Sequence, residues 1–223
     1  MNRLFDPKFL ESHSLEELEA LMESGDMTTF MNACAFLRRV QTQEGYELLK
    51  HHIDHADMYK RRFVLATIFH YPQSQELVPH LEAALNSGSS FLAGTALDVI
   101  IRGMARISDD VLLSYLEQHL ESLSRYTCSA LESVEKSPGN ACRILKMYSV
   151  CQDESIRIGL AEVLYSFCTE ENHMEYFLLF RNEQTPHIRI LACRIAREYH
   201  HTELLDGFTQ DRDGHIRKLA RRR

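Results

Sequence analysis

The sequence predicts an all-α protein on three observations. Leucine is the commonest apolar residue, with 29 copies against 8 of valine, and leucine favours helices whereas valine favours strands. The 223 residues include only 9 Gly and 5 Pro, so sharp turns are few. The third observation is a repeat of about 31 residues, a length that is typical of stacked helix pairs.

The repeat is clearest near the C-terminus. Ile156-Arg157 matches Ile188-Arg189 and Ile216-Arg217, at spacings of 32 and 28 residues. Large apolar residues fill the same slot upstream at similar spacing, and each is followed one to two helical turns later by alanine or cysteine. These upstream residues are Phe30, Tyr59, Phe91 and Tyr126. The even spacing predicts about six consecutive units, each opening with one helix.

An amphipathic helix precedes the first unit. Ser14 with Glu17 matches the capping box of a helix start. The apolar residues that follow are Leu15, Leu18, Leu21 and Met22. Because they share one face, we expect this helix to cover the first unit.

A second helix follows the first helix of each unit. The apolar residues of 77–85 and 112–120 recur at i, i+1, i+4 and i+8, which is one face of a helix. The segment 45–53 fits the same register with a weaker start, and Leu204, Leu205 and Phe208 fit it near the end. The unit is therefore predicted to be a helix pair.

The turns between units contain residues that start helices. Asp153, Thr185 and Asp213 each precede an Ile-Arg pair by three residues, where their side chains can cap the first turn. Pro186 suits the first helical position. The segment 211–214 (DRDG) superficially matches a calcium loop, but the rest of the twelve-residue ligand pattern is absent. We interpret it as the turn between two helices.

This pattern, an aliphatic-Arg pair followed by Ala and preceded by Asp, resembles HEAT-like helical repeats of the short bacterial type. The resemblance covers about residues 27–223 and implies a right-handed α-solenoid of about six helix pairs, with first helices convex and second helices concave. It also implies that Arg157, Arg189 and Arg217 form a structural ladder between repeats. The expected organisation is a single domain over 1–223, with an N-terminal cap (1–26), repeats (27–211) and a basic partial repeat (212–223).

The net charge of −7 is unevenly distributed. Residues 212–223 hold six basic residues and one acid, so the rest of the chain carries −12. An acidic body lowers the expectation of nucleic-acid binding, whereas the basic end could cap the array, dimerise or touch nucleic acid. The chain opens without a secretory signal, and its six Cys form no CxxC. We therefore expect a cytoplasmic protein with reduced, buried thiols, at Cys34, Cys128, Cys142, Cys151, Cys168 and Cys193.

Motifs of catalysis are absent from the sequence. It contains no GxGxxG, no GxxxxGK[ST], no GxSxG and no HExxH. His51 and His55 are four residues apart and could chelate a metal, but a solvated helix end is the preferred interpretation. A Cys-His pair is not excluded by the sequence, although cysteines on core faces are inert. The prediction is a protein without catalysis, cofactor or metal.

The outward positions of the second helices are predicted to bind a partner. They form an acidic stripe with some neutral content, and in the implied solenoid they line the concave groove. These residues are Glu47, Lys50, His51, Glu82, Ser114, Glu117, Gln118 and Glu121. We expect a protein–protein interaction or scaffold module that binds a basic or amphipathic segment of another protein. Ordinary solvated helix faces explain the stripe equally well.

Two other classes of function remain open at this stage. Helical-repeat DNA-binding or repair proteins of the DNA-glycosylase-like type have a similar architecture, but they need a basic concave groove and aromatic residues to face DNA. A partner-dependent lyase built of similar repeats is the other class. The sequence specifies neither the partner's identity nor the oligomeric state.

Overall fold

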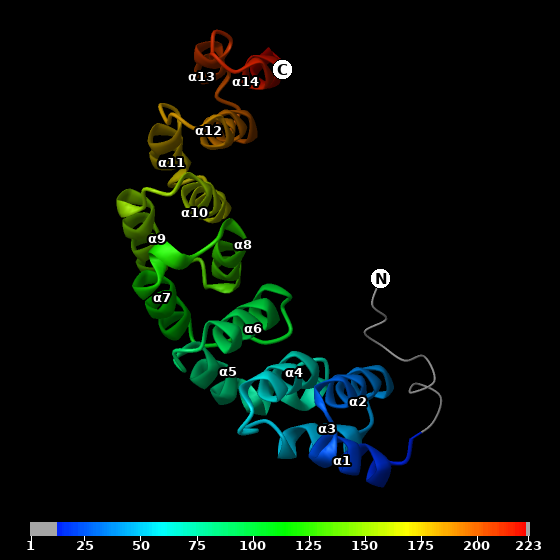
Figure 1. Ribbon diagram of the computed structural model, residues 1–223. Coiled ribbons are helices and arrows are strands. Elements are labelled where there is room, and N and C mark those ends of the chain that lie inside the picture. The colour runs from blue at the N-terminus through cyan, green and yellow to red at the C-terminus, as the bar shows by residue number, and fades with distance from the viewer. Residues whose placement is uncertain (1–12, 222–223) are drawn as a thin grey trace. The chain divides into compact units, whose positions relative to one another are not determined.

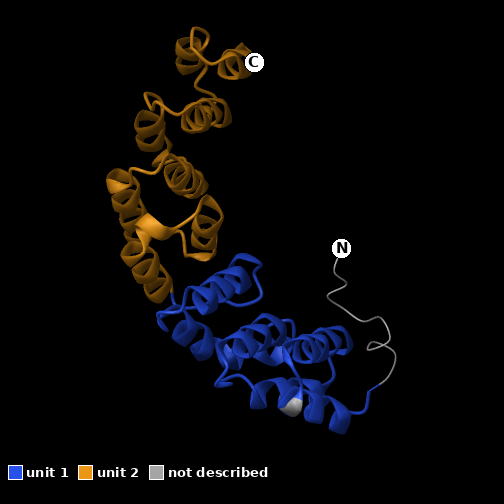
Figure 2. Ribbon diagram, viewed as in Figure 1, with its two compact units in different colours: residues 1–108 blue, residues 109–223 orange. Residues whose placement is uncertain are grey.

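The computed structural model of the protein describes residues 13–221, and this range is all-helical with no strand (Figure 1). The all-α prediction is therefore confirmed. Residues 1–12 and 222–223, parts of the predicted N-terminal cap and basic end, lie outside the described residues. No helix of the described range is both long and apolar enough to cross a bilayer. The chain forms two compact units, unit 1 up to Ser108 and unit 2 from Asp109 (Figure 2).

Unit 1 contains six α-helices and one 3₁₀ helix among its described residues. They are α1 (Leu15–Ser24), α2 (Met27–Val40), α3 (Gln43–His51), α4 (Met58–Ile68), η2 (Pro72–Leu77), α5 (Val78–Leu85) and α6 (Ser90–Ile101). Helix α4 packs between α2 and α6, and we call these three helices the first-helix layer of unit 1. Helices α1, α3 and α5 form its second-helix layer: α3 packs on α2 and α4, α5 on α6, and α1 on α2 and α3.

Unit 2 repeats this two-layer arrangement. Its elements are α7 (Asp109–Gln118), η3 (Leu120–Ser122), α8 (Arg125–Cys128), η4 (Ser129–Ser133), α9 (Pro138–Val150), α10 (Glu154–Ser166), α11 (His173–Phe180), α12 (Pro186–Glu198), α13 (Thr202–Phe208) and α14 (Gly214–Arg221). Helices α8, α10, α12 and α14 pack in that order and form the first-helix layer of unit 2. Helices α7, α9, α11 and α13 form its second-helix layer.

The core of each unit lies between its two layers. In unit 1, Tyr46 from α3 and Leu65 from α4 are almost completely buried. In unit 2, Leu160 from α10 and Phe180 from α11 have no exposed surface. A helix pair of this kind buries one face only, so neighbouring pairs complete each other's core.

Helix starts follow the predicted chemistry with one exception. The capping box of Ser14 and Glu17 opens α1, and Leu18 and Met22 of that helix are buried. Asp153 and Asp213 cap α10 and α14 through bonds to the backbone N–H groups of Ile156 and Ile216.

The expectation for Thr185 was wrong. Its hydroxyl makes no capping bond and instead donates to Glu154 Oε1 at 2.9 Å. Pro186 does occupy the first turn of α12, as expected. The first-turn N–H of Ile188 donates to the Thr185 backbone carbonyl instead, at 3.1 Å.

The upstream register of the repeat differs from the prediction. Ile156 and its two downstream equivalents are buried, as is Phe30, but Tyr59, Phe91 and Tyr126 are 48%, 46% and 54% exposed. These three aromatic residues lie two positions after their N-caps, whereas Ile156 lies three positions after Asp153. One residue rotates a side chain by about 100° around the helix, which moves it from the core to the surface.

The corrected register adds Arg61 to the arginine positions. Arg61 lies four residues after the N-cap Asp57, just as Arg157 lies four residues after Asp153. Its guanidinium pairs with Asp54 at 3.1 Å. The arginine of the repeat therefore recurs in unit 1 at Arg61. The alignment of Tyr59 with Ile156 places the basic residue one position earlier, at Lys60.

The thiols are mostly buried. Cys34, Cys128, Cys151 and Cys193 are buried and Cys168 is half-buried, whereas Cys142 is exposed. All six are free thiols. Burial raises the pKa of Cys34 and of Cys128 to about 12, so these thiols stay neutral and unreactive at physiological pH. The expected burial is therefore confirmed at four of the six cysteines, and not at Cys168 and Cys142.

A buried histidine makes unit 1 sensitive to acid. His52 is 7% exposed, its Nε2 has no hydrogen-bond partner, and its ring lies edge-on to Phe30. Burial, with repulsion from His51 and His55, lowers the pKa of His52 below the usual value of 6.5. A lowered histidine pKa means that the unfolded chain binds the proton more tightly, so stability is lost as the pH falls below about 6.5.

We expect His52→Leu to reduce this acid sensitivity. The free energy of unfolding, from urea titrations at pH 7.5 and 5.5, should fall less on acidification in the variant than in the native protein. His187→Gln, at an exposed position of α12, is the control and should leave the pH dependence unchanged. An identical pH dependence in the native protein and His52→Leu would contradict the assignment.

Candidate partner-binding surfaces

The predicted partner-binding residues lie on the second-helix side of each unit, but in two groups. Unit 1 holds Glu47, Lys50 and His51 on α3 and Glu82 on α5, and unit 2 holds Ser114, Glu117, Gln118 and Glu121 on α7 and η3. Lys50, Glu82 and Ser114 are half-buried, and the other five are exposed. Helical periodicity therefore predicted their outward orientation well.

Three of the predicted residues of unit 1 already form polar contacts within the chain. Lys50 Nζ lies 2.6 Å from Glu76, which also accepts a hydrogen bond from Tyr46. Glu47 accepts a hydrogen bond from Gln43 Nε2, and Glu82 accepts one from the backbone N–H of Ser108 at 3.3 Å. The Lys50 and Glu82 contacts join residues 26 positions apart, about one repeat, so they tie one helix pair to the next.

Arg143 of α9 neutralises the centre of the group in unit 2. Its guanidinium donates two hydrogen bonds of 2.7 Å to the Glu117 carboxylate and one of 2.6 Å to Asp110. It also donates to Ser114 Oγ at 3.0 Å. The bidentate contact with Arg143 lowers the pKa of Glu117 and raises that of Arg143. Sequence reasoning missed Arg143, although its spacing of 26 residues from Glu117 is close to the repeat length.

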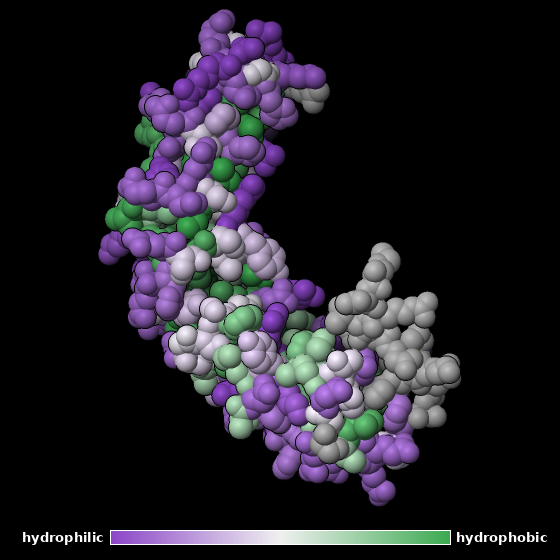
Figure 3. Space-filling model, in the orientation of Figure 1, coloured by the Kyte–Doolittle hydropathy of each residue, from purple (hydrophilic) through white to green (hydrophobic). Residues whose placement is uncertain are grey.

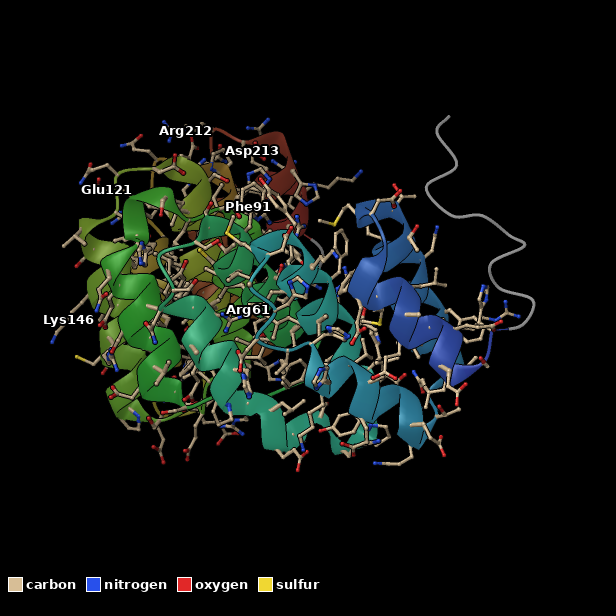
Figure 4. The ribbon with its side chains drawn as sticks, turned by 60° about the horizontal axis from the view of Figure 1, so that its bottom comes forward. Arg61, Phe91, Glu121, Lys146, Arg212 and Asp213 are labelled. Atoms are coloured by element: carbon tan, nitrogen blue, oxygen red, sulfur yellow. The ribbon has the colours of Figure 1, made fainter. Side chains whose placement is uncertain are left out.

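A groove of about 750 Å³ brings three of the predicted residues together in unit 2. Glu117, Gln118 and Glu121 line one wall, and Val150 and Asp153 from the α9–α10 turn line the other. Val150 is 64% exposed, an unusual position for an aliphatic side chain. Glu121 has no hydrogen-bond or ion-pair partner within the described chain and projects from the surface of unit 2 (Figure 4).

The groove also lies where two helices end. Helix α7 ends at Gln118 and α9 ends at Val150, and both residues line it. The last turn of a helix leaves carbonyl oxygens without intrahelical partners and holds a partial negative charge. At α9 such carbonyls are occupied, since Arg157 donates to the Tyr148 carbonyl and Gln152 donates to the Val150 carbonyl. The groove therefore combines one unpaired carboxylate, the negative end of α7 and one exposed aliphatic side chain.

The arginines expected in the ladder make the contacts of structural residues. Arg189, 4% exposed, donates to both Asp211 oxygens at 2.8 and 2.9 Å and to the carbonyls of Glu183 and Gln184. Arg157 donates to the Glu183 carboxylate and to two carbonyls of the preceding turn. Arg217 donates to the carbonyls of Asp211 and Arg212. Each arginine thus holds the turn that precedes its helix.

The turn that superficially matched a calcium loop is occupied in the same way. Asp211 accepts both bonds from Arg189, and Asp213 caps α14. Arg189 lowers the pKa of the Asp211 carboxyl. Figure 4 shows Arg212 and Asp213 in this turn. The Asp211 and Asp213 carboxylates are therefore both engaged in structural contacts.

Several histidines contact the backbone or other rings. His55 Nδ1 accepts the backbone N–H of Asp57, and the described residues contain no group of three or more His, Cys, Asp or Glu that could hold a metal. The structure does bring His173 and His201 together, with their Nε2 atoms 2.8 Å apart and the His173 ring stacked on Tyr199. In the sequence, this contact could be predicted only from the spacing of the two histidines, which is 28 residues and close to one repeat.

Comparison of the sequence with protein-family models and with curated proteins gave no match. The resemblance to HEAT-like repeats therefore rests on the motif residues alone.

We expect Arg189→Ala to lower the free energy of unfolding by about 3 kcal/mol, because it leaves the Asp211 charge, only 9% exposed, without a partner. Urea denaturation followed by circular dichroism measures this change. Arg194→Ala, an exposed position on the same helix, should cost less than about 0.5 kcal/mol.

Removing both charges tests the same ion pair. The double variant Arg189→Met, Asp211→Leu should recover most of the lost stability, because no unpaired charge remains buried. Equal losses in Arg189→Ala and Arg194→Ala would show that the buried pair has no special role.

Proposed function

We propose that this chain is a non-catalytic protein-recognition module, built as a right-handed α-solenoid of about six HEAT-like helix pairs. The support is the arrangement within each unit, where first helices pack on first helices and consecutive pairs are joined by contacts about one repeat apart. Such arrays offer long helical surfaces for extended partners.

The partner class is a basic or amphipathic segment of another protein. The observation behind this proposal is the groove of Glu121, Val150 and the end of α7. The apolar side of such a segment covers Val150, and its lysines or arginines meet the Glu121 carboxylate and the terminal carbonyls of α7. Because Arg143 neutralises Glu117, Glu121 is the main acidic determinant of this groove.

A second candidate function is nucleic-acid binding through the first helices, rather than through the second helices that are expected to line the concave groove of a DNA-glycosylase-like protein. It is favoured by the first-helix layer of unit 2, whose four helices hold eight Lys or Arg and three Glu, a net charge of +5. Arg194, Arg197 and Lys218 are exposed in this layer. Tyr126 of α8 is an exposed aromatic residue there. A phosphate backbone would be attracted to such a surface.

We expect Glu121→Lys to weaken binding of a basic amphipathic peptide at least tenfold, equivalent to about 1.4 kcal/mol. The probe is a fluorescein-labelled helical peptide of leucine and lysine, and fluorescence anisotropy gives its affinity. Glu171→Lys is the matched control, since it makes the same charge change at another exposed position of unit 2.

Two results would count against the proposed groove. One is an equal loss of affinity in Glu121→Lys and Glu171→Lys, which would indicate unspecific attraction to net charge. The other is tighter binding of a single-stranded or duplex oligonucleotide than of the peptide, which would favour the second candidate function.

A further inference from the structure

The two helix layers of unit 1 have opposite charge. Helices α2, α4 and α6 hold five Lys or Arg and one Asp, a net charge of +4. Helices α1, α3 and α5 hold one Lys and seven Glu, a net charge of −6. A net acidic chain therefore presents a basic face on the first-helix layer of unit 1.

A groove of about 460 Å³ lies in this basic face, between α2 and α4. The two helices run parallel, since Lys60 of α4 donates to the Gly25 carbonyl before α2, and Tyr71 after α4 donates to Leu37 near the end of α2. Between the apolar side chains of Met31 and Phe63, the groove is lined by the small residues Cys34, Ala35, Ala66 and Thr67. In Figure 3, white and green surface lies over this part of unit 1.

Two unpaired arginines lie beside the apolar groove. Arg38 and Arg39 line it, are exposed, and make no ion pair or hydrogen bond within the described part of the chain. His70, at the same end of α4, has its pKa lowered by burial and by repulsion from Arg38 and Arg102. The acid of α6, Asp98, is 2.8 Å from Arg102. Positive charge therefore exceeds negative charge at this end of the groove.

Exposed aromatic side chains lie at the other end of the same face. Tyr59 and Phe91, at the starts of α4 and α6, have ring centroids 5.5 Å apart. Arg62 lies over the Phe91 ring at 5.8 Å and donates to Thr95. The face thus has an aromatic end, a groove of small residues and a cationic end.

We propose that this groove binds an acidic, amphipathic segment of a partner protein. Aliphatic side chains of the segment fill the space over Ala35 and Ala66, and its carboxylates pair with Arg38 and Arg39. Charge complementarity selects this occupant, because two exposed, unpaired guanidinium groups beside an apolar surface attract carboxylates that accompany apolar side chains.

The spacing of groups fits a peptide better than a nucleic acid. Proteins that bind single-stranded nucleic acid combine a positively charged groove with aromatic rings on which bases stack. The cations at the aromatic end of this face are already engaged, since Arg62 donates to Thr95, Arg61 pairs with Asp54 and Lys60 donates to the Gly25 carbonyl. Here Arg38 and Arg39 lie near the C-terminal ends of the parallel helices, whereas Tyr59 and Phe91 lie at the N-terminal ends. Helix α4 has 11 residues, so these ends are roughly 15 Å apart.

This site goes beyond the proposed function because it lies in the other unit and takes a partner of opposite charge. One chain would then hold a basic segment at Glu121 and Val150 and an acidic segment at Arg38 and Arg39. Each site has its own variants, so the failure of one leaves the other testable.

The test measures binding of a fluorescein-labelled helical peptide of leucine and glutamate to the full chain by fluorescence anisotropy. We expect the double variant Arg38→Glu, Arg39→Glu to weaken binding at least twentyfold. Ala66→Phe, which fills the groove without changing charge, should weaken it at least tenfold. The control Arg181→Glu, Arg194→Glu reverses two exposed arginines of unit 2 and should change affinity less than twofold.

Circular dichroism first establishes that each variant keeps the native helix content. Glu121→Lys should bind the acidic peptide as the native chain does, which separates this site from the one in unit 2. The proposal is overturned if Ala66→Phe binds normally, if the control loses as much affinity as the Arg38 and Arg39 variant, or if the native chain does not bind the peptide. Tighter binding of labelled oligothymidine than of the peptide would replace it with a nucleic-acid site.

Discussion

The fold depends on contacts between consecutive helix pairs. The Arg189–Asp211 ion pair joins residues 22 positions apart, Lys50–Glu76 joins residues 26 apart, and Tyr148 donates to Glu183 over 35 positions. Each of these bonds joins a residue of one helix pair to a residue of the next pair or of the turn that follows it. A helix pair that buries only one face is stable only when the next pair covers it.

The sequence predicts those features that recur in identical residues. Ile156-Arg157 and its two equivalents mark the starts of α10, α12 and α14, and the isoleucine of each is buried. Arg157 and Arg189 each bond a carboxylate of the following turn, whereas Arg217 bonds only backbone carbonyls of the turn before it. Upstream, Tyr59 was aligned by its size, and the true register depends on the N-cap Asp57. Cap residues define where a helix begins, whereas a large apolar residue can lie on any face.

The candidate site shows a different limit of prediction. Helical period placed Glu117 on the outside, but its electrostatic state depends on Arg143, which belongs to the next helix of the second-helix layer. The packing of α7 against α9 brings Glu117 and Arg143 together. A short stretch of sequence does not reveal how two helices pack. Exposure could therefore be predicted from the sequence, whereas the charge that remains available for a partner could not.

The charge separation between layers has the same sign in both units. In unit 2 the first-helix layer carries +5 and the second-helix layer −4. Each unit thus has an electric dipole across its thickness, although the whole chain is acidic. A charged partner is oriented by such a field before contact, and salt weakens this steering.

Because contacts are limited to neighbouring helix pairs, they also determine how the protein unfolds locally. Helix α14 packs only against α12 and α13 among the principal helix contacts of the described chain, so its loss exposes one interface and leaves the preceding pairs intact. Amide hydrogens in such an array exchange earliest at the end and progressively later toward the interior.

The predominance of contacts between neighbouring pairs also implies rapid folding, because few distant segments must meet before the first pairs become stable.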